Sequence, residues 1–481
     1  MASLAAPPEF RHTYARSLPT LAASWTAQES PDPQLVMTNT DLAKQLGIDP
    51  EWLTSDQALR LFSGNEPAET AEHYALAYAG HQFGSYSPRL GDGRALLIGE
   101  FTDPHGKQWD LHLKGSGRTP FARGGDGKAT LGPMLREYLM GEAMAALGIP
   151  TTRALAVVTT GDLAMREQPL PGAILVRVAD SHLRVGTFQY AAALGAIDDL
   201  RALADYAIDR HYPELSHDND RYLKLLGAVT ERQASLVAQW MLVGFIHGVM
   251  NTDNVTISGE TIDYGPCAFM DIVDPHTVFS SIDAGGRYAY GRQPSITQWN
   301  LSRFAETLLP LIATNPEDAV APATQVLEEF PDMFSRYWHE GMNHRLGLST
   351  TVDGDDDLAD DLISLLQEQR LDLISTMRSL SDSLRGHDIG LGEWTHRWSS
   401  RLQREAASRE ELISRLEAAN PIYVPRNHLV EEALSGAVAG DLSTFTALLE
   451  RVKNPYQHID NAERYSQPGD PGPGYRTYCG T

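Results

Sequence analysis

The feature that most constrains the fold is a change of pattern along the chain, from short apolar runs to long helical ones. Between residues 74 and 177, glycines separate apolar runs of strand length: Ala95–Ile98, Trp109–Leu113, Leu155–Val158 and Ala173–Val178. Runs this short, with β-branched residues, predict strands. Among them, residues 131–147 have apolar residues at helical spacing and an early proline, which predicts one helix. From about residue 190 onward helical patterns dominate.

This order predicts an α+β fold with two lobes. We divide the 481 residues into four parts. Residues 1–70 form an N-terminal extension of loops and short helices, residues 71–188 a strand-rich lobe, and residues 189–345 a helical lobe. Residues 346–481 form a further helical region with a tail rich in proline and glycine, which no single regular element can accommodate.

Composition and charge exclude several classes of protein. The 39 basic and 63 acidic residues give a net charge of −24, which disfavours nonspecific binding to nucleic acid. Two cysteines exclude a disulfide framework and a four-thiolate zinc site.

The most apolar stretch, residues 236–250, is too short to span a bilayer and is interpreted as a buried helix. The first 25 residues lack the pattern of a secretory signal, so we expect a cytoplasmic protein without a membrane partner.

Two features of the strand-rich lobe are suited to binding phosphate. Gly91 and Gly93 lie in Leu-Gly-Asp-Gly-Arg before an apolar run, and glycines let a backbone turn approach phosphate oxygens. Lys114 ends the next strand, where an inward-facing ammonium could contact a nucleotide. Each feature alone is also compatible with a plain hairpin turn or an exposed lysine.

A lysine beneath a cleft needs a carboxylate to stay charged and oriented. Glu137 lies on the predicted helix, 23 positions after Lys114, and Glu142 is a competitor on the same helix. We prefer Glu137.

The segment after the buried stretch, His-Gly-Val-Met-Asn-Thr-Asp-Asn, matches part of the kinase catalytic-loop pattern H-R-D-L-x-x-x-N. His247 and Asn254 match in type and spacing, whereas Val249 occupies the position of the catalytic aspartate. Valine cannot accept a proton, so ordinary kinase chemistry through this position is lost. Asp253, directly before the asparagine, supplies a carboxylate instead.

The triplet Asp263-Tyr264-Gly265 follows a predicted short hairpin formed by residues 255–262 and matches D-F-G with an aromatic exchange. Asn254 and Asp263 would flank that hairpin and hold one Mg²⁺. The order of these motifs, more than any one of them, predicts a two-lobed protein-kinase-like fold that binds ATP.

At these residues the chain resembles the selenoprotein O (YdiU) family of protein adenylyltransferases, which have a kinase-like fold. The resemblance extends from about residue 74 to residue 271 and returns at residues 478–481. The strings that carry it are HYALAYAGHQFG, LGDGRA, LKGSGRTPFARGGDGKA, LREYLMGEAM, HGVMNTDN and DYGPCAFMD.

The resemblance implies transfer of AMP from ATP to Ser, Thr or Tyr hydroxyls of target proteins, in some members of UMP, with pyrophosphate leaving. It also implies that ATP binds in an orientation inverted relative to kinases. The ATP contacts that it implies are Gly91, Gly93, Arg94, Lys114, Asp126, Gly127, Arg177, Arg184 and Asp263. Two arginines seven positions apart are, independently, suitable donors to phosphate.

By the same resemblance, Glu137 pairs with Lys114, and Asn254 and Asp263 ligate Mg²⁺ or Mn²⁺. Asp253 is the implied proton acceptor. In eukaryotic members selenocysteine stands where Cys479 stands here, and we hypothesise a redox-dependent bridge between Cys479 and Cys267; two free thiols are the alternative.

Two other functions remain open from the sequence. One is an ordinary phosphotransferase in which Asp253 replaces the missing aspartate. The other is a scaffold that binds ATP without catalysis, against which the set of Lys114, Glu137, Asn254 and Asp263 argues.

Overall fold

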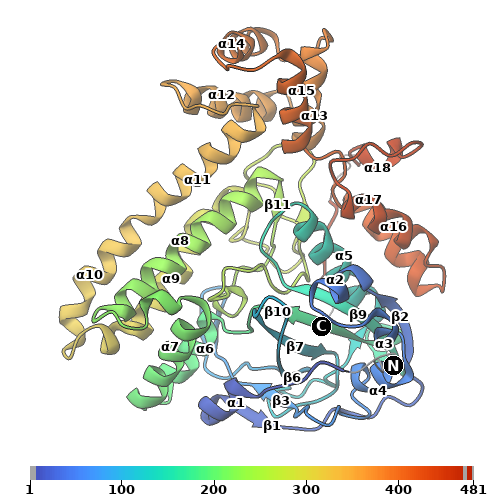
Figure 1. The fold of residues 1–481 in the computed structure, drawn as a ribbon, viewed down its shortest axis with the longest axis vertical. Helices are drawn as coiled ribbons and strands as arrows, with labels where there is room; N and C mark the ends of the chain where they lie inside the picture. The colour runs from blue at the N-terminus through green and yellow to red at the C-terminus, as the bar shows by residue number, and fades with distance from the viewer. Residues whose placement is uncertain (1–6, 470–473, 479–481) are drawn as a thin grey trace.

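A computed structural model describes residues 7–469 and 474–478 of the chain. It shows a mixed α and β protein, as expected, with a large antiparallel sheet and many helices (Figure 1). The strands are β1 Ala22–Ser24, β2 Gln34–Thr38, β3 Tyr74–Leu76, β4 Gly80–Gln82, β5 Ser85–Ser87, β6 Ala95–Thr102, β7 Gln108–Lys114, β8 Ala129–Thr130, β9 Arg153–Met165, β10 Pro169–Ala179, β11 Phe245–Ile246 and β12 Ala268–Phe269.

The helices of the first half are α1 Thr13–Ser17, α2 Thr40–Gln45, α3 Pro50–Leu53, α4 Asp56–Phe62, α5 Leu131–Ala146, α6 Val185–Ala193, α7 Ile197–His211 and α8 Arg221–Leu242. Those of the second half are α9 Gln293–Ile312, α10 Pro316–Glu328, α11 Phe330–Arg345, α12 Asp355–Glu368, α13 Leu373–Leu384, α14 Gly392–Leu402, α15 Arg409–Ala419, α16 Asn427–Val438, α17 Ser443–Lys453 and α18 Glu463–Ser466. No helix among the described residues is both long enough and apolar enough to cross a bilayer.

The large sheet has the strand order β1-β3-β6-β7-β10-β9-β2, and β8 pairs with β10. All four strands predicted from short apolar runs are confirmed as β6, β7, β9 and β10. Successive residues of β10 enter different cores, Leu175 on the side of α5 and Ile174 and Val176 on the side of α2 to α4. Both faces of the sheet are therefore covered, which explains why successive residues of a central strand such as β10 can both be apolar.

The N-terminal extension is more than loops and short helices. Its strands β1 and β2 form the two ends of the sheet, and its helices α2 and α4 contact β9. These strands are only three and five residues long, so they carry little alternating pattern for a sequence analysis to detect. The four-part division of the chain stays a prediction.

Helix α5 is confirmed, and it carries Glu137. Twelve of its sixteen residues are buried, because the sheet strands β9 and β10 cover one side and helices α16 and α17 another. In Figure 1, α16 and α17 stand beside α5, while α8, α9 and α11 extend away from the sheet toward α12 to α15. The C-terminal region is therefore packed against the helix that carries Glu137.

Two expectations for the centre of the chain are wrong. The buried helix ends at Leu242 and does not continue to Met250, because Gly244 has a left-handed φ of 72°, a conformation that terminates helices. Residues 255–262 do not form a hairpin ladder. Thr256 bridges to Arg184 and Thr261 to Thr151, so the backbone bridges of this segment join it to residues that lie far from it in the sequence.

Candidate active site

Three cationic side chains converge on the carboxylate of Asp263. Lys114 Nζ, at the end of β7, lies 2.5 Å from Oδ1, and Arg177 Nη1, on β10, lies 2.8 Å from the same atom. Arg184, the residue before α6, places Nη1 3.4 Å from Oδ2. All three cations are buried. In a chain with a net charge of −24, this is a local concentration of positive charge built by three separate elements.

Glu137 is the second anion of this cluster. Its Oε2 lies 2.6 Å from Lys114 Nζ, and its Oε1 lies 3.2 Å from Arg177 Nη1. Glu142 is not in the cluster, since it accepts two hydrogen bonds of 2.7 Å from Arg153. The structure thus places the preferred glutamate, and not its competitor, beside Lys114.

The cations decide the ionisation of Asp263. Burial by itself favours the neutral acid, but Lys114, Arg177 and Arg184 together outweigh it and hold the pKa of Asp263 well below its usual range. The backbone of Asp263 has a left-handed φ of 63°, an uncommon conformation for a residue with a side chain. A permanently charged carboxylate is therefore held in a strained turn at the centre of the cluster.

Asp253 has the opposite environment. It lies in the 3₁₀ turn Thr252–Asn254, is 8% exposed, and its Oδ1 has no hydrogen-bond partner among the described residues. Burial, and to a smaller extent the charge of Asp263, raises the pKa of Asp253 to about 6, against the opposing effects of Arg184 and Gln82. A carboxyl group with a pKa in this range can exchange a proton near neutral pH.

Gly80 explains how the chain accommodates Asp253. A Cβ at residue 80 would lie 2.6 Å from Asp253 Oδ1, so only glycine allows strand β4 to lie against the carboxylate. Arg184 connects the two aspartates, because its Nη1 lies near the Asp263 carboxylate and also donates to the backbone oxygen of Asp253 at 2.9 Å. Its guanidinium stacks over the ring of Tyr78, 4.5 Å from the centroid.

The matched residues of the loop are in structural roles. His247 Nε2 lies 2.9 Å from the carbonyl oxygen of Ile262 and so ties the loop to the residue before Asp263. Val249 is buried in the apolar core. Asn254 donates its amide Nδ2 to the carbonyl oxygen of Val249 at 2.9 Å, a bond in which its amide oxygen takes no part.

The glycine turn packs against a neighbouring loop. Gly91 has a φ of 72°, and a Cβ there would lie 2.3 Å from Phe121 Cγ; a Cβ at Gly93 would lie 2.9 Å from the carbonyl oxygen of Phe121. Both glycines are thus required by close packing as well as by any approach to phosphate. Arg94 follows the turn and lines a cavity of about 830 Å³ together with Lys114 and Glu137.

That cavity has the size of a site for a small molecule. Its opposite walls come from α16 and from residues 474–478, in which Tyr475 Oη donates to Glu431 at 2.8 Å. The C-terminal segment therefore lines the same cavity as Lys114 and Glu137, although it comes from the far end of the chain.

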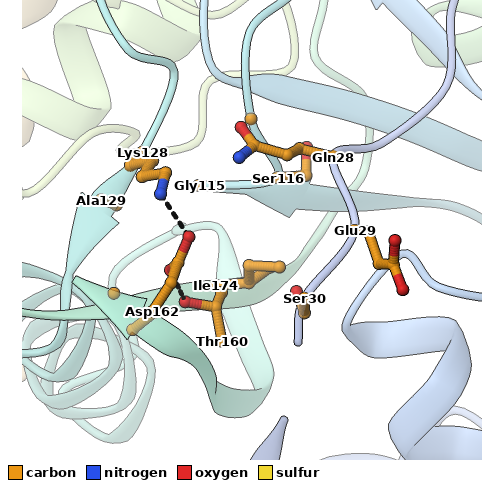
Figure 2. A pocket seen from close by; sticks show the side chains of 13 residues that line it. Gln28, Glu29, Ser30, Gly115, Ser116, Lys128, Ala129, Thr160, Asp162 and Ile174 are labelled. Atoms are coloured by element: carbon orange, nitrogen blue, oxygen red, sulfur yellow. Dashed lines mark hydrogen bonds and ion pairs between the residues drawn. The ribbon is translucent and has the colours of Figure 1, made fainter. Parts of the chain in front are cut away.

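Asp126 and Gly127 lie in the loop between β7 and β8. Asp126 pairs with Arg166 at 2.8 Å instead of contacting Lys114 or Asp263. Gly127 has a φ of 72°, and its backbone oxygen accepts from Gly117. Figure 2 shows the next residue, Lys128, bonded to Asp162 beside a pocket of only about 10 Å³, which has room for about one water molecule.

Cys267 is buried and forms no disulfide within the described residues, and burial raises the pKa of its thiol to about 12. Thr477 Oγ1 donates to the carbonyl oxygen of the preceding residue, Pro266, at 2.6 Å. Cys479 lies outside the described residues, so the expected pairing of the two cysteines stays a prediction.

Sequence reasoning missed Tyr78, Gly80, Gln82 and the buried pair Asp92 and His112. Glycine at position 80 was the one available signal, within the string HYALAYAGHQFG. The others are ordinary residue types whose positions only the fold reveals.

Comparisons with known proteins identify the family of this chain. The family described as "Protein adenylyltransferase SelO" matches residues 8–453. A protein of Mycolicibacterium smegmatis named "Protein nucleotidyltransferase YdiU" is 55% identical, with 97% of each chain covered. Proteins of the same name from Anoxybacillus flavithermus and Geobacillus kaustophilus are each 54% identical, covering 94% and 93% of this chain and 94% of each relative. The chain therefore belongs to the SelO family of protein adenylyltransferases.

Proposed function

We propose that this protein transfers AMP from ATP to Ser, Thr or Tyr hydroxyls of other proteins and releases pyrophosphate. The observation that carries the proposal is the difference between two carboxylates. Three cations keep Asp263 charged, whereas the pKa of Asp253, ten residues earlier, is raised to about 6, so that Asp253 can take up a proton near neutral pH. Family membership supports the reaction class. The arrangement of lobes would be that of a protein kinase.

In this proposal ATP binds between the glycine turn and Asp263. Lys114, Arg177 and Arg184 would carry the phosphates, with Arg94, Asp126 and Gly127 as further contacts. Arginines form paired hydrogen bonds with phosphate oxygens, and burial strengthens these interactions. Arg177 and Arg184 are each only 2% exposed, which supports an inverted nucleotide with its distal phosphates innermost.

The residues present fit a divalent cation. The Asp263 carboxylate and the Asn254 amide oxygen are hard oxygen donors of the kind that Mg²⁺ and Mn²⁺ prefer, and Mg²⁺ commonly takes one or two protein ligands together with substrate phosphates. When bound, the ion would neutralise charge on the phosphate oxygens. No group of three or more His, Cys, Asp or Glu residues suited to a metal occurs in the described part of the chain, so ATP would complete the coordination.

Asp253 would be the proton acceptor. As the acceptor hydroxyl oxygen bonds to the α-phosphorus, its proton passes to the Asp253 carboxylate. The bond from the α-phosphorus to the oxygen bridging to the β-phosphate breaks, and pyrophosphate leaves with that oxygen. Lys114, Arg177 and Arg184 would stabilise the charge on the departing group.

Two further parts of the proposal concern regulation and location. A disulfide between Cys267 and Cys479 would restrain the segment after Asp263, with Thr477 already bonded beside Cys267. The cytoplasm remains the compartment we propose, and ATP and protein substrates are the partners.

The test is incubation of the protein and a mixed protein substrate with ATP labelled at either the α- or the γ-phosphate, with Mg²⁺ or Mn²⁺. We expect covalent label from the α-position, at an intact-mass increase that matches AMP. Label from the γ-position alone would show an ordinary phosphotransferase, and binding of ATP without any label would show a scaffold.

A further inference from the structure

A buried histidine connects the arginine beside Asp263 to the glycine turn. His112 lies on β7, two residues before Lys114, and is 0% exposed. Its Nδ1 lies 3.3 Å from Arg177 Nη2, and its Nε2 lies 2.9 Å from Asp92 Oδ2. Asp92 is the residue between Gly91 and Gly93.

The partners fix the protonation of the ring. A guanidinium nitrogen can only donate, so Nδ1 of His112 must accept, and it does so only without a proton. Nε2 must then carry the proton and donate it to the Asp92 carboxylate. Burial lowers the pKa of His112, against the opposing effect of Asp92, which agrees with a neutral ring.

Asp92 passes this connection to the end of strand β3 and to the loop that holds Thr119. Its Oδ2 accepts from the backbone nitrogen of Leu76 at 3.2 Å, and its backbone oxygen accepts from Thr119 Oγ1 at 2.5 Å. Thr119 belongs to the loop whose Phe121 packs on Gly91 and Gly93. A continuous path of hydrogen bonds therefore runs from Asp263 through Arg177, His112 and Asp92 to the glycine turn.

A second histidine supports the ring from one face. His182 stacks on His112 with centroids 4.2 Å apart, and its Nδ1 lies 3.0 Å from Asp110 Oδ2. Asp110 in turn pairs with Arg210 at 2.6 Å. The ring of His112 is thus fixed in orientation as well as in protonation.

We propose that His112 is a positioning residue for nucleotide transfer: as a neutral Nε2–H imidazole it holds Arg177 and the glycine turn at a fixed separation, so that both meet one triphosphate. The inference rests on the proposed function. It requires no contact between His112 and ATP.

Three substitutions separate the two bonds. In Asn the side-chain oxygen lies at the same number of bonds from Cβ as Nδ1, so His112→Asn keeps an acceptor for Arg177. In Gln the amide nitrogen corresponds to Nε2, so His112→Gln keeps a donor for Asp92. His112→Phe keeps the ring volume and removes both bonds. His211→Phe is the matched control, because His211 is also buried, at 9% exposure, and bonds Ser181 at 2.7 Å without a contact to Arg177.

We expect His112→Phe to lower kcat/KM for ATP about 100-fold. It should also weaken the binding of an ATP analogue with a methylene bridge between the α- and β-phosphates. His112→Asn and His112→Gln should each lower kcat/KM about tenfold. The change in Tm should not exceed that of His211→Phe, whose activity per folded molecule should stay at the wild-type level. If His112→Phe matches wild type per folded molecule, or loses no more than the control, the proposal is wrong.

A spectroscopic measurement on the wild-type protein tests the same point without activity. In ¹⁵N-histidine spectra, assigned with His112→Gln, the His112 ring should show a protonated Nε2 and an unprotonated Nδ1. The reverse tautomer or a doubly protonated ring would overturn the proposal. Because analogue binding and the tautomer need no turnover, they remain decisive for His112 even if the wild-type protein transfers no AMP.

Discussion

The two carboxylates of the site differ in what surrounds them. Asp263 has Lys114, Arg177 and Arg184 against its oxygens, and its pKa is far below the ordinary value. Asp253 has Gly80 against its Oδ1, and its pKa is raised to about 6. Two acids whose environments separate their pKa values in this way are suited to different tasks. One remains an anion that can hold a metal, and the other can take up a proton.

The largest effect is expected from removing the carboxylate of Asp263, which lies between the three cations. Asp263→Ala deletes the proposed metal ligand and leaves Lys114, Arg177 and Arg184 without this carboxylate partner. We expect AMP transfer to fall about 10⁴-fold, because metal-ion stabilisation of phosphate charge contributes several kcal/mol. The measurement is incorporation of α-labelled AMP, with circular dichroism as the control for folding. Retention of activity in a folded variant would exclude Asp263 as a ligand.

The next largest effect concerns the proton acceptor. Asp253→Asn keeps the shape of the side chain and removes its basicity, so kcat should fall about 10²–10³-fold. The Kd for ATP should change less than threefold, since in our proposal the phosphates bind Lys114, Arg177 and Arg184 and not Asp253. Single-turnover transfer and calorimetric titration measure the two quantities. A large change in Kd with an unchanged kcat would reverse the roles assigned to the two carboxylates.

The same variant tests the electrostatic difference directly through stability. The pKa of Asp253 is raised in the folded protein, from 3.8 to about 6, so the folded state binds this proton more tightly than the unfolded chain. Its contribution is therefore favourable below about pH 4 and is lost as pH rises toward about 6 and above.

At pH 8 we expect Asp253→Asn to be more stable than wild type by at most about 3 kcal/mol, from a shift of about two units at 1.36 kcal/mol each. At pH 4 the advantage should disappear. Urea unfolding at the two pH values checks this, and equal differences at both would contradict a raised pKa.

A smaller effect separates the two glutamates of α5. Glu137→Gln weakens the partner of Lys114 while Asp263 remains, so we expect a loss of about tenfold in kcat/KM. Glu142→Gln is the matched control: it removes the charge paired with Arg153 and should lower Tm with little effect on kcat/KM. Equal kinetic losses in both variants would show that Glu137 acts through helix stability alone.

Much of the site was predictable because its residues follow motifs of fixed order. Lys114 and Glu137 lie on a strand and a helix that the sequence indicates, and the structure brings Lys114 beside both Glu137 and Asp263. The choice between Glu137 and Glu142 required the fold, since both lie on one buried helix whose neighbours differ on each side.

Other features depend on contacts between distant segments. The glycines at 91 and 93 were attributed to phosphate, yet a loop some thirty residues away also requires them. Residues 255–262 alternate like a hairpin, but their partners are Arg184 and Thr151, which no local pattern reveals. His112 looked like any strand residue, because its partner Asp92 lies 20 residues earlier, in the turn before β6.

The most direct test is a crystal structure with Mg²⁺ and the ATP analogue carrying a methylene bridge between the α- and β-phosphates. The account predicts the ion between Asn254 and Asp263, the α-phosphate on the side of Asp253, and the distal phosphates at Arg177 and Arg184. A triphosphate with its γ-phosphate nearest Asp253, and neither arginine in contact with a phosphate, would contradict it.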